Sequence, residues 1–173
     1  MPITPLHFGP GTVLKVIAGQ YISLTVFSFS QITMDIEVIV RLMRGAESLH
    51  GFSNTIIGAT VQLIPTILVG RPVCTAFLRW WNRNLSPAQA KLMSVNSSIT
   101  WKAAWIGGIL GLYSHWFLDA MMHVAAQPFW PLSSSNLFVT WLSISNVNAL
   151  CIWSLIIGGA LLLTINFWGR VRY

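Results

Sequence analysis

The sequence predicts an all-α fold: a polytopic transmembrane helix bundle of four long spanning helices, with a short N-terminal helix that forms a hairpin with the first of them. Of the 173 residues, 54% are hydrophobic and only 8% are charged. The mean hydropathy is +0.66, so the composition lies outside the usual range of soluble domains. The apolar residues fall in separate stretches, most of them near the roughly 20 residues that cross a bilayer as a helix. The length fits one integral membrane domain, residues 1–173.

The N-terminal part of the chain predicts a short helix followed by a long one. Residues 8–18 are apolar, but they are too few to cross a roughly 30 Å hydrocarbon core at about 1.5 Å per residue. Gly19 and Gln20 then allow a turn. Residues 21–43 are long enough to span, so we expect a hairpin between the two segments.

Residues 51–69, 98–123 and 146–168 complete the predicted set of spanning helices. Pro65 lies near the end of the first of these, where a kink is tolerable. Residues 71–97 are polar and rich in Arg and Trp, which predicts either an interfacial amphipathic helix or a solvated loop. Residues 124–148 carry no charge and contain Pro and Ser runs, which predicts a loop.

The basic residues predict the orientation. One side of the predicted bundle has only Arg41 and Arg44, whereas the other collects Lys15, Arg71, Arg79, Arg83, Lys91, Lys102, Arg170 and Arg172. The richer side is expected to be cytoplasmic, which predicts a multi-pass inner-membrane protein with a cytoplasmic C-terminus and membrane lipids as partners. The formal net charge is +6. Because its cations are spread over segment ends rather than gathered on one face, no nucleic-acid partner is expected.

Ionisable side chains within the apolar stretches are the most informative feature for function. All four histidines and three of the four acids, Asp35, Glu37 and Asp119, lie in or at the ends of such stretches. Each charged side chain costs about 2.5–3.5 kcal/mol or more at the centre of a spanning helix. Residues retained there usually face the interior of a bundle and have a function.

The spacing of these residues predicts a metal site. His115, Asp119 and His123 follow one another at i, i+4 and i+8, which aligns them on one helix face. His7 and Asp35 lie about 13 and 15 residues from the predicted turn, so they reach a similar depth in the hairpin. Glu37 follows Asp35 by two positions, so only one of them can point at a common centre, and Asp35 is the expected ligand.

His50, with Asn54 four residues later on the same helical face, adds a donor from a separate segment. The predicted metal ligands are His7, Asp35, His50, His115, Asp119 and His123. They are enough for one or two divalent ions such as Zn, Mn or Mg. The alternative is a polar cluster that only holds the helices together.

Four runs of sequence resemble a known family of membrane-bound metal-dependent hydrolases, the bacterial and archaeal LexA-regulated inner-membrane proteins. They are Pro5-Leu6-His7-Phe8-Gly9-Pro10-Gly11, Met34-Asp35-Ile36-Glu37, Leu49-His50-Gly51-Phe52-Ser53-Asn54-Thr55 and Tyr113-Ser114-His115-Trp116-Phe117-Leu118-Asp119. The resemblance covers most of the chain and implies that His7, Asp35, His50, His115 and Asp119 bind metal. In the family's His-x3-His element the second histidine is here Asn54, and an amide oxygen suits Mg or Mn better than Zn.

Two functions from different classes are expected. The first is a metal-dependent hydrolase acting on a phosphoester or lipid-linked substrate near the outer leaflet, with Glu37 or Asp119 as proton acceptor. The alternative is a non-enzymatic integral membrane subunit of a larger membrane protein complex. In that case Asn54 indicates a site that has lost its catalytic activity. A small transporter or proton channel is less favoured, because no internal repeat is visible.

Overall fold

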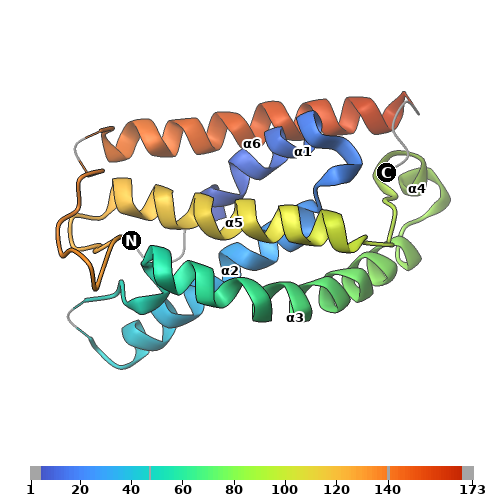
Figure 1. Ribbon diagram of the computed structural model, residues 1–173. Helices are drawn as coiled ribbons and strands as arrows, with labels where there is room; N and C mark the ends of the chain where they lie inside the picture. The colour runs from blue at the N-terminus through green and yellow to red at the C-terminus, as the bar shows by residue number, and fades with distance from the viewer. Residues whose placement is uncertain (1–4, 47, 140, 169–173) are drawn as a thin grey trace.

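The computed structural model describes residues 5–46, 48–139 and 141–168, and all regular secondary structure in them is helical, as predicted. The helices are α1 (Gly9–Ala18), α2 (Leu24–Met43), α3 (Ile56–Arg83), α4 (Pro87–Met93), α5 (Trp101–Met122) and α6 (Ile144–Phe167), with short 3₁₀ turns at Pro5–Phe8, Gly19–Tyr21 and Phe52–Asn54. The four long helices run roughly along one direction, and α1 lies beneath α6 (Figure 1). The predicted short helix, turn and long helix at the N-terminus are confirmed.

Both ends of α3 differ from the prediction. The helix begins at Ile56 rather than at Gly51, so His50 and Asn54 lie on the preceding loop and 3₁₀ turn and not on one face of this helix. The helix does not end at Val69 but continues through Pro65 and Pro72 to Arg83, so the first half of the polar stretch 71–97 is helical. An interior proline removes one backbone hydrogen bond and bends a helix without always ending it, and a change from apolar to polar side chains does not itself end a helix. This additional part of α3 contacts the segment just before α5, because the Arg71 guanidinium donates a hydrogen bond to the carbonyl of Ile99. Only α4 is a separate short helix.

Glycines let the helices approach closely, as their clustering in α5 predicts. A Cβ atom at Gly107 would lie 2.5 Å from the carbonyl oxygen of Ser23, so α5 packs directly on the backbone of α2. A Cβ at Gly158 would meet the backbone nitrogen of Val13 at 2.7 Å, so α6 packs in the same way on α1. The arms of the hairpin therefore have different neighbours, with α1 mainly on α6 and α2 mainly on α5.

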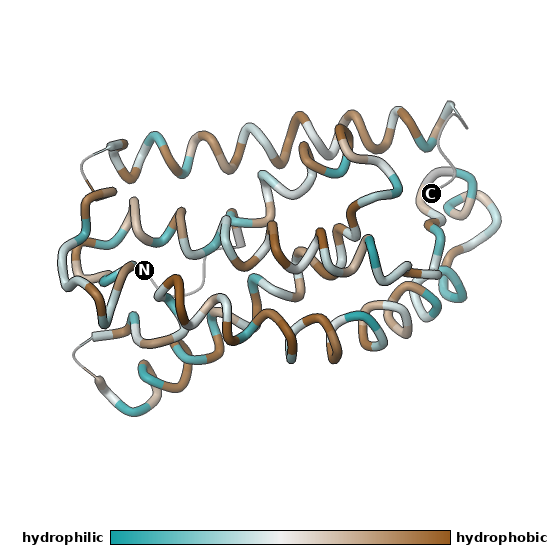
Figure 2. The backbone as a smooth tube through the Cα atoms, viewed as in Figure 1, coloured by the Kyte–Doolittle hydropathy of each residue, from teal (hydrophilic) through white to brown (hydrophobic). Residues whose placement is uncertain are grey.

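Two of the described helices, α3 and α6, are long and apolar enough to cross a membrane. Both expose apolar side chains, such as Ile64 on α3 and Trp153 on α6, rather than burying them. Figure 2 places polar residues mainly at the two ends of the bundle and apolar ones along its middle. The helices α2 and α5 have 20 and 22 residues but carry the ionisable residues of the cluster described below.

The connections gather at two ends of the bundle (Figure 1). Residues 5–8, 44–46, 48–55, 123–139 and 141–143 meet at one end, which we call the histidine end because it holds His7, His50 and His123. Residues 19–23 and 84–100 meet at the other, which we call the lysine end because Lys15, Lys91 and Lys102 lie there. The chain thus brings its separate histidines to one end of the bundle, as predicted.

Candidate metal centre

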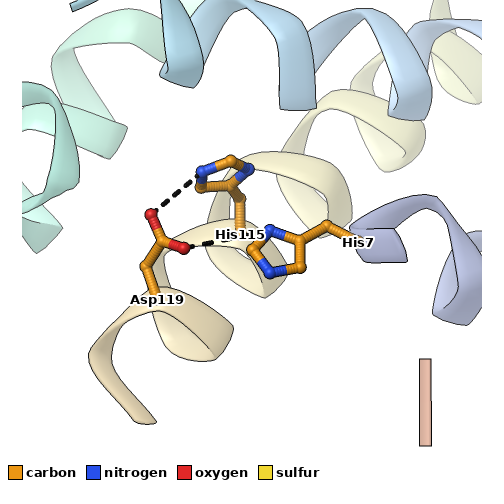
Figure 3. Close-up of side chains that lie close together, drawn as sticks. All are labelled: His7, His115 and Asp119. Atoms are coloured by element: carbon orange, nitrogen blue, oxygen red, sulfur yellow. Dashed lines mark ion pairs between the residues drawn. The ribbon is translucent and has the colours of Figure 1, made fainter. Parts of the chain in front are cut away.

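His7, His115 and Asp119 lie together in the interior, and each offers one ligand atom within 4.8 Å of the others (Figure 3). His115 Nε2 is 3.1 Å from Asp119 Oδ2, and His7 Nδ1 is 3.9 Å from Asp119 Oδ1. The i, i+4 spacing on α5 sets the first pair. His7 reaches them from the 3₁₀ turn that precedes α1. All three are buried.

The imidazole nitrogens of this group have the features of metal ligands. Both ring nitrogens of His7 and the Nε2 atom of His115 are buried, and among the described residues none has a hydrogen-bond partner. A buried polar atom without a partner costs about 1–3 kcal/mol. A divalent ion would satisfy one ring nitrogen of His7 together with Nε2 of His115, and two imidazoles with one carboxylate are a common protein ligand set for Zn²⁺ and similar ions. The residues therefore fit a metal ion.

Gln31, which carries no charge to mark it in the sequence, orients His115. Its amide nitrogen donates to the Gly111 carbonyl at 2.9 Å and contacts Ser114 Oγ at 3.3 Å. These contacts identify the amide oxygen as the atom facing His115 Nδ1, 2.9 Å away, so Nδ1 carries the proton and donates. In the neutral imidazole the lone pair of His115 is then on Nε2, which points at Asp119. Gln31 lies one turn before Asp35, and that spacing could have predicted its place on the buried face.

The remaining predicted ligands surround the same centre. Asp35 Oδ1 is 3.6 Å from His115 Nε2, and His50 Nδ1 is 3.7 Å from Asp119 Oδ2. His123 Nε2 is 3.9 Å from Asp119 Oδ1, and its ring stacks on that of His50 with centroids 4.2 Å apart. All six predicted residues therefore meet, with Asp119 at the centre. His123 is the C-cap residue of α5 and has an extended backbone. Of the three ligands predicted on this helix, only His115 and Asp119 therefore lie within it.

Asn54, the departure from the family pattern, lies next to the cluster. Its side-chain nitrogen is 2.8 Å from Nδ1 of His50. Its amide oxygen is buried without a hydrogen-bond partner among the described residues. Burial also lowers the pKa of His50 from 6.5 to about 4, which keeps this imidazole neutral near pH 7. Nδ1 of the neutral His50 therefore accepts a hydrogen bond from Asn54, and the amide oxygen of Asn54 is left as a possible metal ligand on the loop side of the cluster.

The structure does not bring Glu37 into the cluster. Its Oε1 accepts hydrogen bonds from Arg41 Nε at 2.8 Å and from the backbone nitrogen of Phe52 at 3.2 Å. Its Oε2 accepts one from the backbone nitrogen of Ser53 at 2.6 Å. Glu37 thereby fastens the 3₁₀ turn next to His50 to α2. The contacts give Glu37 a structural task, and the catalytic role that the sequence suggested for it stays a prediction.

Comparison with protein-family models, curated proteins and solved structures gives no match to this chain. The resemblance to the inner-membrane hydrolases stays a prediction from the sequence runs. What the fold and the site define is an all-helical protein with two helices able to span a membrane and a buried His/Asp group able to hold a metal ion.

Proposed function

We propose that this protein is a multi-pass inner-membrane hydrolase that uses a divalent metal ion to cleave a phosphoester or lipid-linked substrate near the outer leaflet. The observation that carries the proposal is His7, whose two buried ring nitrogens have no hydrogen-bond partner among the described residues although the ring lies beside His115 and Asp119. A cluster that served only to hold helices together would pair these atoms with one another or with backbone groups.

The membrane placement follows from length and charge. We propose that α2 and α5 span together with α3 and α6, with their ionisable residues facing the interior of the bundle. The basic residues of the lysine end are Lys15, Arg71, Arg79, Arg83, Lys91 and Lys102. This end is therefore the cytoplasmic one, which puts the histidine end outside. Arg170 and Arg172, on which the cytoplasmic C-terminus also depends, lie outside the described residues.

His7, His115 and Asp119 would hold the ion, and their two nitrogens favour Zn over Mg or Mn. When bound, the ion would lower the pKa of a water and neutralise negative charge on the substrate. Because Glu37 is engaged by Arg41 and the loop backbone, we propose Asp35 as the proton acceptor. The Asp35 side chain lies beside His115 and retains 12% exposure, so it can pass a proton to solvent.

A small pocket supports an anionic substrate. It has a volume of about 230 Å³ at the histidine end, and Arg41 and His50 are among the residues that line it. His50 also contacts Asp119 in the cluster, so its side chain connects the pocket with the metal centre. The guanidinium of Arg41 suits a phosphate group there.

The test is the metal content of the detergent-purified protein, measured by plasma mass spectrometry. We expect about one or two equivalents of a divalent ion, and loss of this ion in a variant with His115→Gln and Asp119→Asn. The matched control is Tyr113→Phe on the same helix, which removes only a hydroxyl that contacts Thr60. In Asp35→Asn we expect bound metal without hydrolysis in phosphoester screens.

Metal-free wild-type protein that is folded would overturn the proposal, as would a double variant that keeps its ion. That result would favour the alternative of a non-enzymatic subunit. The exposed apolar side chains of α6, among them Trp153, Ile156 and Leu163, would then be the surface on which to seek an integral membrane partner.

A further inference from the structure

A large cavity lies at the lysine end, away from the metal centre. It has a volume of about 1290 Å³, is open on one side, and is bordered by residues of all six helices. Lys15, Lys91 and Lys102 line it, and none of the described residues in its wall is acidic. The described acids Asp35, Glu37 and Asp119 belong to the other end. The cavity is therefore positive, with no described carboxylate to neutralise it.

The folded backbone adds to this positive charge and holds Lys15 in place. Ser23 and Thr100, the N-cap residues of α2 and α5, both line the cavity, so the positive ends of two helix dipoles meet there. Lys15 Nζ donates to the carbonyls of Gly19 and Ile22, at 2.9 and 3.0 Å. These contacts fix its charge beside the turn between α1 and α2.

Other parts of the wall are apolar, which is not expected of a site for a small soluble anion. Leu24, Leu78, Ile99, Leu162 and Phe167 all line it. The volume also exceeds the range of about 300–1,000 Å³ that is usual for small-molecule sites. A ligand that fills such a space needs both an anionic group and a hydrocarbon part.

We propose that the cavity at the lysine end binds an acidic phospholipid, with the headgroup phosphate near Lys91 and Lys102 and an acyl chain against the apolar wall. The cytoplasmic leaflet carries the anionic lipids. It is also the leaflet that the proposed membrane placement gives to this end. The inference shares that placement with the proposed function but does not depend on the metal centre.

The experiment measures binding of fluorescent phosphatidylglycerol and phosphatidylcholine to the full chain in detergent. We expect clear preference for phosphatidylglycerol and a loss of about tenfold to thirtyfold for the variant with Lys91→Gln and Lys102→Gln, since each basic residue contributes about 1 kcal/mol. The matched control is Arg79→Gln with Arg83→Gln, which removes the same charge from the same end at positions that do not line the cavity. We expect it to bind within about twofold of wild type.

Three results would overturn the proposal: no preference between the two lipids, an equal loss in both double variants, or displacement of the lipid by free glycerol phosphate at stoichiometric concentration. The first two would indicate diffuse surface attraction, and the third a soluble anion as the ligand. Lys91→Gln alone, at an exposed position of α4, gives the same comparison if the double variant does not fold. Unchanged metal content in the lysine variants would separate this outcome from that of the metal centre.

Discussion

The amide oxygen of Gln31 lies 2.9 Å from Nδ1 of His115, and so joins α2 to α5 at the centre of the site. Loss of this acceptor frees the His115 ring to rotate or to change tautomer. We therefore expect Gln31→Leu to weaken metal binding by about 10–100-fold. Gln31→Glu, which keeps an acceptor oxygen, should restore most of the affinity. The dissociation constant, measured by competition with a chelator, checks both expectations.

The control for this prediction is Gln62→Leu on α3. Gln62 also carries a partly buried amide, but its contacts are the sulfur of Met34 and the carbonyl of Ser53, not a ring of the cluster. We expect its affinity for metal to stay near that of wild type. Nitrogen-15 NMR of labelled histidine gives a second readout. A His115 tautomer that is unchanged in Gln31→Leu would contradict the role given to Gln31.

Different physical signals explain what the sequence could and could not predict. The bounds of α1, α2, α5 and α6 follow from apolar length, and the cluster follows from histidines and acids placed where burial is costly. The extension of α3 past Val69 could not be predicted from hydropathy. Hydropathy indicates whether a helix lies in apolar or polar surroundings, and it does not indicate where the helical backbone ends. Gln31 was missed because a neutral amide carries no charge to mark it. The loop contacts of Glu37 depend on tertiary structure alone.

Glu37 fixes the 3₁₀ turn that follows His50, so neutralising it should loosen that turn. Hydrogen bonds to a charged group contribute about 1.5–3 kcal/mol. We therefore expect Glu37→Gln to speed hydrogen exchange at the amides of Phe52 and Ser53 by about tenfold or more. Arg44→Gln, an exposed change at the same end of α2, should leave these rates unchanged. Exchange that is equally fast in both variants would contradict the prediction.

His50 makes stability depend on pH in a defined window. Its pKa is lowered from 6.5 to about 4 by burial in the folded protein. Between these two values the unfolded chain binds more protons than the folded one, so stability present above about pH 6.5 is lost as the pH falls toward 4. We expect the Tm of the metal-free protein to fall across this window, and to fall less in His50→Gln. Identical pH profiles would show that His50 makes no contribution.

Gly111 joins the packing of the bundle to the metal centre. A Cβ atom there would meet Ser30 Oγ and would lie 2.8 Å from the carbonyl oxygen of Phe27. The backbone of α2 would have to shift to make room for it, which costs free energy of folding. Its own carbonyl accepts the hydrogen bond from Gln31. We therefore expect Gly111→Ala to destabilise the fold by about 1–3 kcal/mol and to weaken metal binding as well.

Gly159→Ala on α6 is the matched control, because a Cβ atom at Gly159 meets nothing within 4 Å. Alanine is favoured over glycine in a helix by about 1 kcal/mol, so this variant should be as stable as wild type or slightly more stable, with unchanged affinity for metal. Thermal unfolding in detergent and chelator competition measure the two effects. Equal stability of the two variants would mean that α2 and α5 separate readily, and that the close contact at Gly111 does not hold the site together.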